Sequence, residues 1–177
     1  MPVNVHPTNQ IPGAGEQDAG MPPATRVTPA PGQESVWDYP RPPRVEPSAD
    51  EVVARTRAAL RVLETSHPPA YYLPYASFVE GSLLPVGGTT YCEFKGTASY
   101  VDVVAGGRRA TRAGWTYRQP SPGFEVLVDH VALMPGAMDE CTVDGEVVEP
   151  QAGGFYGGWI TSHVVGPFKG GLGTTGW

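Results

Sequence analysis

The sequence predicts a mainly β domain of short antiparallel strands, arranged as a small sandwich or an open barrel. Glycine (23) and proline (20) make up about a quarter of the 177 residues, roughly twice their usual share, and both are poor helix formers. Runs of β-forming residues recur with turn signals roughly every 8–12 residues. The mass of 18.8 kDa suits one domain with a core of its own.

Composition and charge exclude several classes of protein. No apolar run approaches the roughly 18 residues of a membrane-spanning helix, so we expect no membrane insertion. The N-terminal residues show no secretory signal and the two cysteines stand 49 positions apart, which favours a cytoplasmic protein. A formal net charge of −6 disfavours binding to nucleic acid. No two histidines have metal-ligand spacing and no nucleotide-binding motif is present, so we expect neither a metal nor a cofactor.

Glycine and proline divide the chain into segments of different character. Residues 1–35 hold 7 prolines and 4 glycines with almost no aromatic side chain, and we expect them to form a disordered arm. Residues 36–177 are expected to form the β domain. Its last 25 residues, 153–177, combine 9 glycines with nine large apolar side chains. This mixture predicts an ordered C-terminal strap that packs back on the domain.

The first half of the domain contains one ambiguous element and one predicted hairpin. Residues 50–65 suit either a helix, because of their Ala and Leu, or two short strands, because of their valines. Residues 91–95 predict a strand that leads into another over 98–104. A turn at 105–107 (AGG) then returns the chain through 112–117.

The second half contains shorter elements. Residues 124–128 are expected to make one helical turn after a Pro-Ser-Pro-Gly break. Residues 131–134 (VALM) predict a buried strand. The stretch 142–148 places Asp144-Gly145 between β-formers, which is the strongest short hairpin signal.

Four blocks together resemble the DUF427 family, a bacterial and fungal domain of unknown function. They are residues 64–74 (ETSHPPAYYLP), 90–100 (TYCEFKGTASY), 115–117 (WTY) and 153–159 (GGFYGGW). The resemblance runs from about residue 36 to residue 177 and implies a Mss4-like fold, an open barrel or β-tent. Zinc-binding relatives of that fold carry paired Cys-x-x-Cys ligands, and this sequence has none, so zinc is not implied.

The family is sometimes labelled nucleotidyltransferase-like. Such enzymes need a Gly-Ser turn followed closely by an Asp-x-Asp pair that holds catalytic metal. Gly81-Ser82 is present, but residues 83–101 lack such a pair. The label therefore gains no support from the sequence.

Lys95 is the first candidate site residue, one of two lysines in the chain and expected in mid-strand. In a partly closed pocket it would bind an anion or form a Schiff base, and the alternative is a strand lysine whose head reaches solvent. Strand alternation places Cys92 with Phe94, opposite Lys95, as a small core residue. The same alternation makes Glu93 the expected partner of Lys95.

A second cluster lies on a proline-flanked loop and comprises Glu64, His67, Tyr71 and Tyr72. A carboxylate, an imidazole and two phenols there suit acid–base chemistry or the binding of a small polar ligand. Alternatively, Glu64 satisfies loop amides and one tyrosine fills the barrel.

The function hypothesis is a small-molecule-binding β domain, with catalysis left open. Its candidate catalytic residues are Lys95, as electrophile or anion anchor, and Glu64, as acid–base group. The expected ligand-binding residues are Tyr72, Cys92, Tyr100, Trp115 and Tyr117, of which the last three fall on neighbouring strands and would otherwise be simple core. The alternative is a non-catalytic interaction or dimerisation module that uses the C-terminal strap, which leaves a homo-oligomer open.

Overall fold

A computed structural model describes residues 35–39, 43–46 and 52–174. The expected disordered arm therefore lies, apart from its last residue, outside the described residues. The strands are β1 (Ser35–Tyr39), β2 (Pro43–Glu46), β3 (Ala54–Arg55), β4 (Ala59–Leu63), β5 (Ala70–Pro74), β6 (Leu83–Cys92), β7 (Gly96–Ala105), β8 (Arg108–Thr116), β9 (His130–Leu133), β10 (Glu140–Val143), β11 (Glu146–Val147), β12 (Glu149–Pro150) and β13 (Trp159–Ile160). The 3-10 turns within these described ranges are η2 (Tyr75–Ser77), η3 (Glu125–Leu127) and η4 (Pro135–Ala137).

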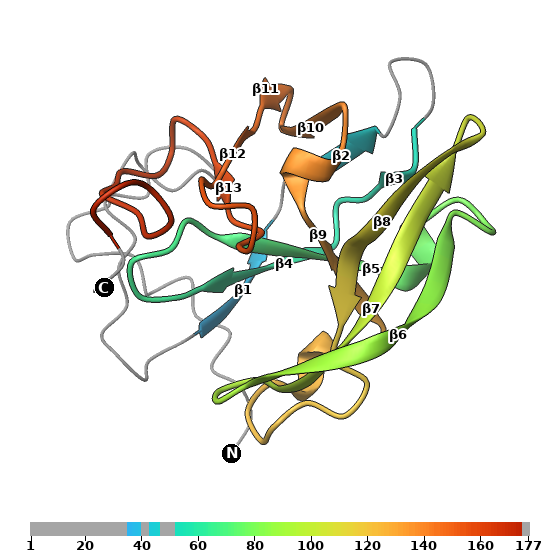
Figure 1. Ribbon diagram of the computed structural model, residues 1–177, viewed down its shortest axis with the longest axis horizontal. Coiled ribbons are helices and arrows are strands. Elements are labelled where there is room, and N and C mark those ends of the chain that lie inside the picture. The colour runs from blue at the N-terminus through green and yellow to red at the C-terminus, as the bar shows by residue number, and fades with distance from the viewer. Residues whose placement is uncertain (1–34, 40–42, 47–51, 175–177) are drawn as a thin grey trace.

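Two antiparallel sheets organise these strands (Figure 1). The larger has seven strands in the order β1-β4-β5-β9-β8-β7-β6, which leaves β1 and β6 at its two edges. The smaller has four strands in the order β11-β10-β2-β3, and β12 pairs separately with β13. The mainly β fold class predicted from the sequence is confirmed.

Each face of the larger sheet carries its own hydrophobic cluster, because successive side chains of a strand point to opposite faces. Val131 and Leu133 on β9 join one cluster, and Ala132 between them joins the other. The first cluster also contains Cys141 and Val143 from β10, so it fills the space between the two sheets. The second cluster, on the opposite face, adjoins the cavity described below.

Residues 50–65 form the two strands β3 and β4 rather than a helix, as far as they are described. All five residues of β4 are buried, because the strand lies between β1 and β5 and is covered on both faces. Four of the five residues of β4 are apolar, the exception being the buried Arg61, and such a composition is typical of a strand covered on both faces, whereas a surface helix would carry polar residues at every turn.

The expected hairpins and turns are present. β7 and β8 are joined at Gly106-Gly107, and β10 and β11 at Asp144-Gly145. Asp144 (φ 54°) and Gly145 (φ 84°) both take the left-handed conformation that a two-residue hairpin turn requires. The 3-10 turn η3 lies within the expected helical turn at 124–128.

One element differs from its prediction. The strand expected over residues 91–95 ends at Cys92, and Glu93, Phe94 and Lys95 form the turn that joins β6 to β7. Gly96 begins β7 with a φ of 91°, a conformation that favours glycine and closes the turn. Lys95 is therefore a turn residue and not a mid-strand residue.

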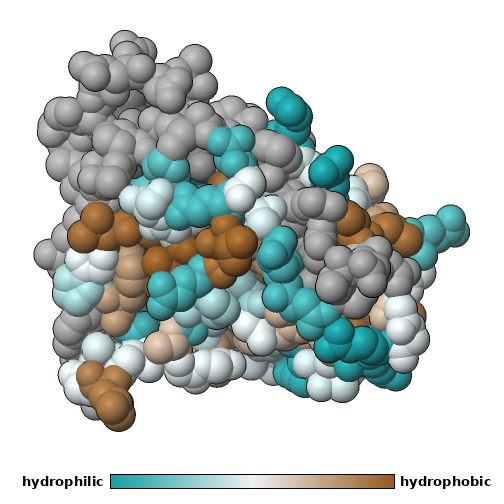
Figure 2. All heavy atoms as spheres, turned by 90° about the horizontal axis from the view of Figure 1, so that it is seen from above, coloured by the Kyte–Doolittle hydropathy of each residue, from teal (hydrophilic) through white to brown (hydrophobic). Residues whose placement is uncertain are grey.

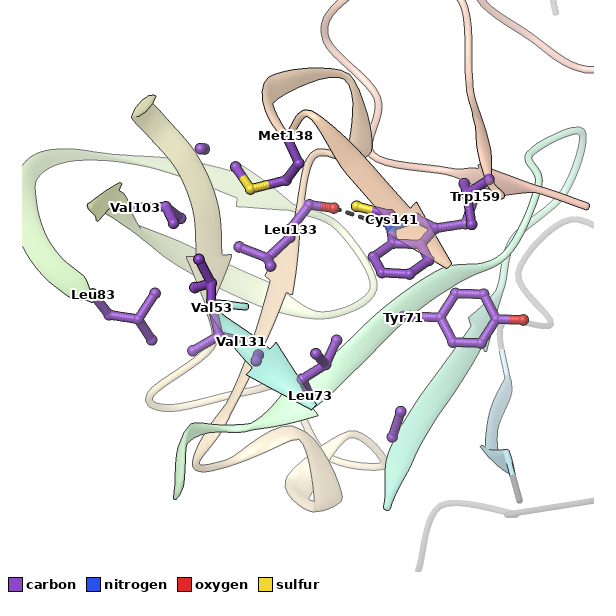
Figure 3. Close-up of a cluster of buried hydrophobic side chains, with 14 of the residues drawn as sticks. Val53, Tyr71, Leu73, Leu83, Val103, Val131, Leu133, Met138, Cys141 and Trp159 are labelled. Carbon is purple, nitrogen blue, oxygen red and sulfur yellow. Dashed lines mark hydrogen bonds between the residues drawn. The ribbon is translucent and has the colours of Figure 1, made fainter. Parts of the chain in front are cut away.

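The C-terminal strap supplies the largest side chain of the core. Trp159 on β13 is fully buried in the cluster between the sheets, where its ring lies 5.1 Å from the ring of Tyr71. Its indole nitrogen donates to the backbone oxygen of Leu133 at 3.1 Å, the dashed line in Figure 3. Its backbone N–H donates to the oxygen of Pro69 at 2.8 Å. These contacts attach the strap to β9 and to the start of β5.

On the surface, hydrophobic side chains appear in separate brown patches between hydrophilic ones (Figure 2). The most exposed large apolar side chains come from several elements, among them Tyr91, Val147, Phe155 and Leu172. No helix within the described ranges is long and apolar enough to cross a membrane.

Candidate functional site

A tight turn after β4 places the first two site residues. The backbone N–H of His67 donates to the oxygen of Glu64 at 3.2 Å, and Ser66 adopts a positive φ of 59°. Pro68 and Pro69 then stiffen the entry into β5. Glu64 and His67 thus lie at the two ends of one constrained turn, and both line the same cavity.

The turn between β6 and β7 places Lys95. Its backbone oxygen accepts a hydrogen bond from the Ser121 N–H at 3.1 Å, which ties the turn to the loop after β8. The side chain points inward rather than to solvent, since Lys95 is only 3% exposed. A turn lysine with a free choice of rotamers would extend into water, so this burial requires a partner.

Glu64 is that partner. The Nζ atom of Lys95 lies 2.5 Å from Oε1 of Glu64, with the lysine side chain 4% exposed and the glutamate side chain 26% exposed. The lysine is therefore the deeper member of the pair. A carboxylate at this distance favours the charged ammonium form, which suits an anion anchor better than an amine nucleophile. Glu93, expected from strand alternation to pair with Lys95, lies in the same turn and is not the residue that binds it.

Aromatic residues from the larger sheet form a wall beside this pair. Trp115 on β8 donates its indole N–H to the Tyr72 oxygen on β5 at 3.1 Å, and the two rings meet edge to face. Tyr100 on β7 pairs in register with Trp115. The hydroxyl oxygen of Tyr100 lies 2.8 Å from the hydroxyl oxygen of Thr90. Tyr117 packs 6.3 Å from Tyr72, centroid to centroid.

Two of these phenols are held in their neutral, hydrogen-donating form. Burial raises the pKa of Tyr72 well above its usual range, and the neighbouring Lys95 charge opposes the shift only in part. Burial likewise raises the pKa of Tyr117. Neither residue will ionise near neutral pH, so both keep an O–H that can donate to a ligand.

The C-terminal strap closes another side of the cavity. Phe155, Tyr156, Gly157 and Gly158 line it, together with Gln151 just before the strap. Gly157 lies so close to Trp115 that an added Cβ would overlap the indole ring. The composition of residues 153–177 predicted packing of this kind. Gln151 carried no signal in the sequence, because a single polar residue after a proline matches no motif.

The cavity enclosed by these elements has a volume of about 280 Å³. All seven residues selected from the sequence line it, namely Glu64, Tyr72, Cys92, Lys95, Tyr100, Trp115 and Tyr117. Cys92 and Lys95 thus share one cavity. Strand alternation, which separated them, does not apply because the chain turns after Cys92.

Other candidates lie elsewhere. Tyr71, adjacent to Tyr72, points to the opposite face of the sheet and packs on Trp159. Cys141 is buried between the sheets, and burial raises its pKa to about 12. Among the described residues, no group of three or more His, Cys, Asp or Glu side chains is placed to hold a metal ion.

A comparison of the sequence with protein families gives a match that covers most residues of this site. A family model described as a domain of unknown function (DUF427) matches residues 35–144. No curated protein matches the chain. The matched range holds Glu64, Lys95 and the aromatic wall, and it ends before Gln151 and the C-terminal strap.

Proposed function

The chain belongs to the DUF427 family, and from that premise we propose that it is a small-molecule-binding β domain. One observation carries the proposal: a buried ammonium, that of Lys95, lies at an aromatic-walled cavity of about 280 Å³. A cavity of this size holds a fragment-sized molecule, because pockets for drug-sized ligands start at about 300 Å³.

The balance of donors and acceptors indicates the charge of the ligand. Lys95 and the phenols of Tyr72 and Tyr117 are donors, and Glu64 is the acidic acceptor that faces Lys95. Among these four side chains, donors therefore outnumber acceptors. The ligand that fits has a flat apolar body, which packs on the aromatic wall, and a carboxylate or similar oxygen-rich head group.

Burial of the ion pair supports a role beyond stability. Lysine is almost never buried unless paired, and a buried pair is weak evidence for stabilisation because desolvation offsets the attraction. A site that binds an anion has a reason to keep such a charge away from bulk water. The attraction between the ammonium and the ligand is stronger in the protein interior, where the dielectric constant is lower.

The position of the C-terminal strap favours a pocket over a docking module. Its Trp159 is fully buried and bonded to β9, so this side chain is not available to a partner chain. Its Tyr156 and Gly157 line the cavity. The strap thus serves the site as a wall.

Titration of the full chain with benzoate, cinnamate and indole-3-acetate, each against its uncharged amide, tests the proposal. We expect the carboxylates to shift the indole N–H resonance of Trp115 saturably and the amides to bind more weakly. Lys95→Met should weaken carboxylate binding at least tenfold, because the anion loses its charged donor. Arg118→Met removes an exposed positive charge that does not line the cavity and should leave affinity unchanged. Absence of saturable shifts, or equal affinity in Lys95→Met, would overturn the proposal.

A further inference from the structure

Gln151 lies beside the cavity with both N–H groups engaged. Its amide nitrogen lies 2.7 Å from the backbone oxygen of Lys169 and 2.9 Å from Nδ1 of His67. A backbone carbonyl can only accept a hydrogen bond, so the atom that faces it must be the amide nitrogen and not the amide oxygen. The Lys169 contact therefore fixes which way the Gln151 amide points.

The second N–H of the same nitrogen then points at His67. Since this N–H is a donor, Nδ1 of His67 must be the acceptor and carries no proton. A neutral imidazole with a bare Nδ1 has its proton on Nε2. The geometry thus selects one of the two histidine tautomers.

The amide oxygen of Gln151 carries the cost of this orientation. Its amide oxygen is buried and has no hydrogen-bond partner in the described part of the chain. Leaving a buried acceptor unsatisfied is unfavourable, so the two donated bonds must outweigh this cost. The contact between Lys169 and Gln151 is itself held in place, because the backbone N–H of Lys169 donates to Ser66 oxygen at 2.8 Å in the turn that carries His67.

We propose that Gln151 is a positioning residue that holds His67 as the neutral Nε2–H tautomer, which makes His67 a second N–H donor for the head group of the ligand. This inference deepens the proposed function and depends on it for the ligand. His67 lines the cavity together with Lys95, and no hydrogen bond to its Nε2 occurs among the described residues. An oxyanion would then be bound by one charged and one neutral N–H donor.

The charged and titratable groups around His67 are consistent with a neutral ring. Burial lowers the pKa of His67 below its usual value of 6.5. Glu64, at the other end of the turn, opposes this shift, whereas Lys169 and Lys95 reinforce it. Tyr156 packs against the imidazole, with ring centroids 4.6 Å apart.

The tautomer can be observed without any ligand. In a long-range ¹H–¹⁵N correlation spectrum of the full chain, we expect unprotonated Nδ1 and protonated Nε2 signals for His67 from pH 7 to 9. Gln151→Glu replaces the donor with an acceptor and should move the proton to Nδ1 and raise the pKa of His67. Gln119→Glu, at an exposed position, is the matched control and should change neither. A wild-type spectrum with the proton on Nδ1, or with two equally populated tautomers, would overturn the proposal even if Gln151→Glu fails to fold.

The donor role is tested with the carboxylates named above. His67→Gln and His67→Leu both lose the Nδ1 contact, but the glutamine amide restores an N–H near the position of Nε2. We expect His67→Leu to weaken binding at least tenfold and His67→Gln to stay within about threefold of wild type. Equal affinities in the two variants would refute the donor role. If no carboxylate binds the wild type, the proposed function and the donor role fail together, and the spectrum still decides the tautomer.

Discussion

Lys95 and Glu64 are unequal members of one ion pair. The lysine side chain is almost fully buried, whereas about a quarter of the glutamate side chain reaches solvent. Desolvation therefore weighs mainly on the ammonium, and the carboxylate is what makes its burial tolerable. The two residues come from different turns 31 positions apart, so their contact also joins the β4–β5 loop to the β6–β7 hairpin.

The two single variants of this pair should differ in stability. Glu64→Gln leaves a buried charge opposite a neutral amide, and we expect it to lower the free energy of unfolding by roughly 1–3 kcal/mol. Lys95→Met leaves a carboxylate that water can reach, so its cost should be smaller. Urea unfolding at pH 7 followed by circular dichroism measures both. A larger loss in Lys95→Met would contradict this account of the pair.

At the scale of elements, β8 depends on a glycine for its place in the sheet. A Cβ on Gly114 would lie 2.8 Å from Cγ2 of Val101 and 3.0 Å from the backbone oxygen of Ala132. β7 and β9, the two neighbours of β8, therefore both approach it closely at this residue. The aromatic wall depends on the same approach, since Trp115 follows immediately.

Gly114→Ala should consequently destabilise the protein by about 1–3 kcal/mol, the usual cost of overpacking. Gly87→Ala is its control, because an added Cβ there meets nothing within 4 Å. This control should leave the free energy of unfolding within about 0.5 kcal/mol of wild type. Equal effects in thermal or urea unfolding would show that β8 tolerates the added methyl group.

Elements with strong local signals could be predicted from the sequence. Asp144-Gly145 has the turn chemistry of a two-residue hairpin, and the AGG turn is equally local. Residues 50–65 could not be decided, because a mostly apolar stretch such as residues 59–63 (ALRVL) suits a buried strand as well as a helix. That choice depends on pairing with β1 (Ser35–Tyr39) and β5 (Ala70–Pro74), which lie outside this stretch of the chain.

The composition of the site was predictable to a similar degree. The family blocks identified Lys95, Glu64 and the aromatic residues, which line one cavity in the structure. The prediction that Glu93 pairs with Lys95 was wrong, because it assumed that the alternation of a strand continued through residue 95. Gln151 and the tautomer of His67 could not be predicted, since they depend on the backbone of Lys169, 18 positions downstream.

At the scale of the whole molecule, the folded core extends past the range of the family match. Trp159 belongs to the cluster between the two sheets, although the match ends at residue 144. The C-terminal strap is therefore needed both for the core and for the cavity.

Trp159→Ala should lower the free energy of unfolding by about 3–5 kcal/mol, because it leaves a large cavity and an unpaired Leu133 carbonyl. Phe155→Ala, at a strap position that is 68% exposed, should stay within about 0.5 kcal/mol of wild type. Urea unfolding followed by far-UV circular dichroism compares them without relying on tryptophan fluorescence. A small effect of Trp159→Ala would mean that the strap folds independently of the sheets.

Two parts of the chain line the cavity. The early part, inside the range of the family match, carries Glu64 and Lys95 in turns between the strands of the larger sheet, and the late part, residues 151–158, carries Gln151, glycines and aromatic residues of the opposite wall. These two parts meet at His67, whose Nδ1 accepts from Gln151, and at Trp115, which lies close to Gly157. A chimaera with residues 151–158 replaced should therefore keep Lys95 as the charged anchor but lose the contact that positions His67. Recognition of the head group is thereby divided between the two parts, with the charge in the early part and control of the second donor in the late one.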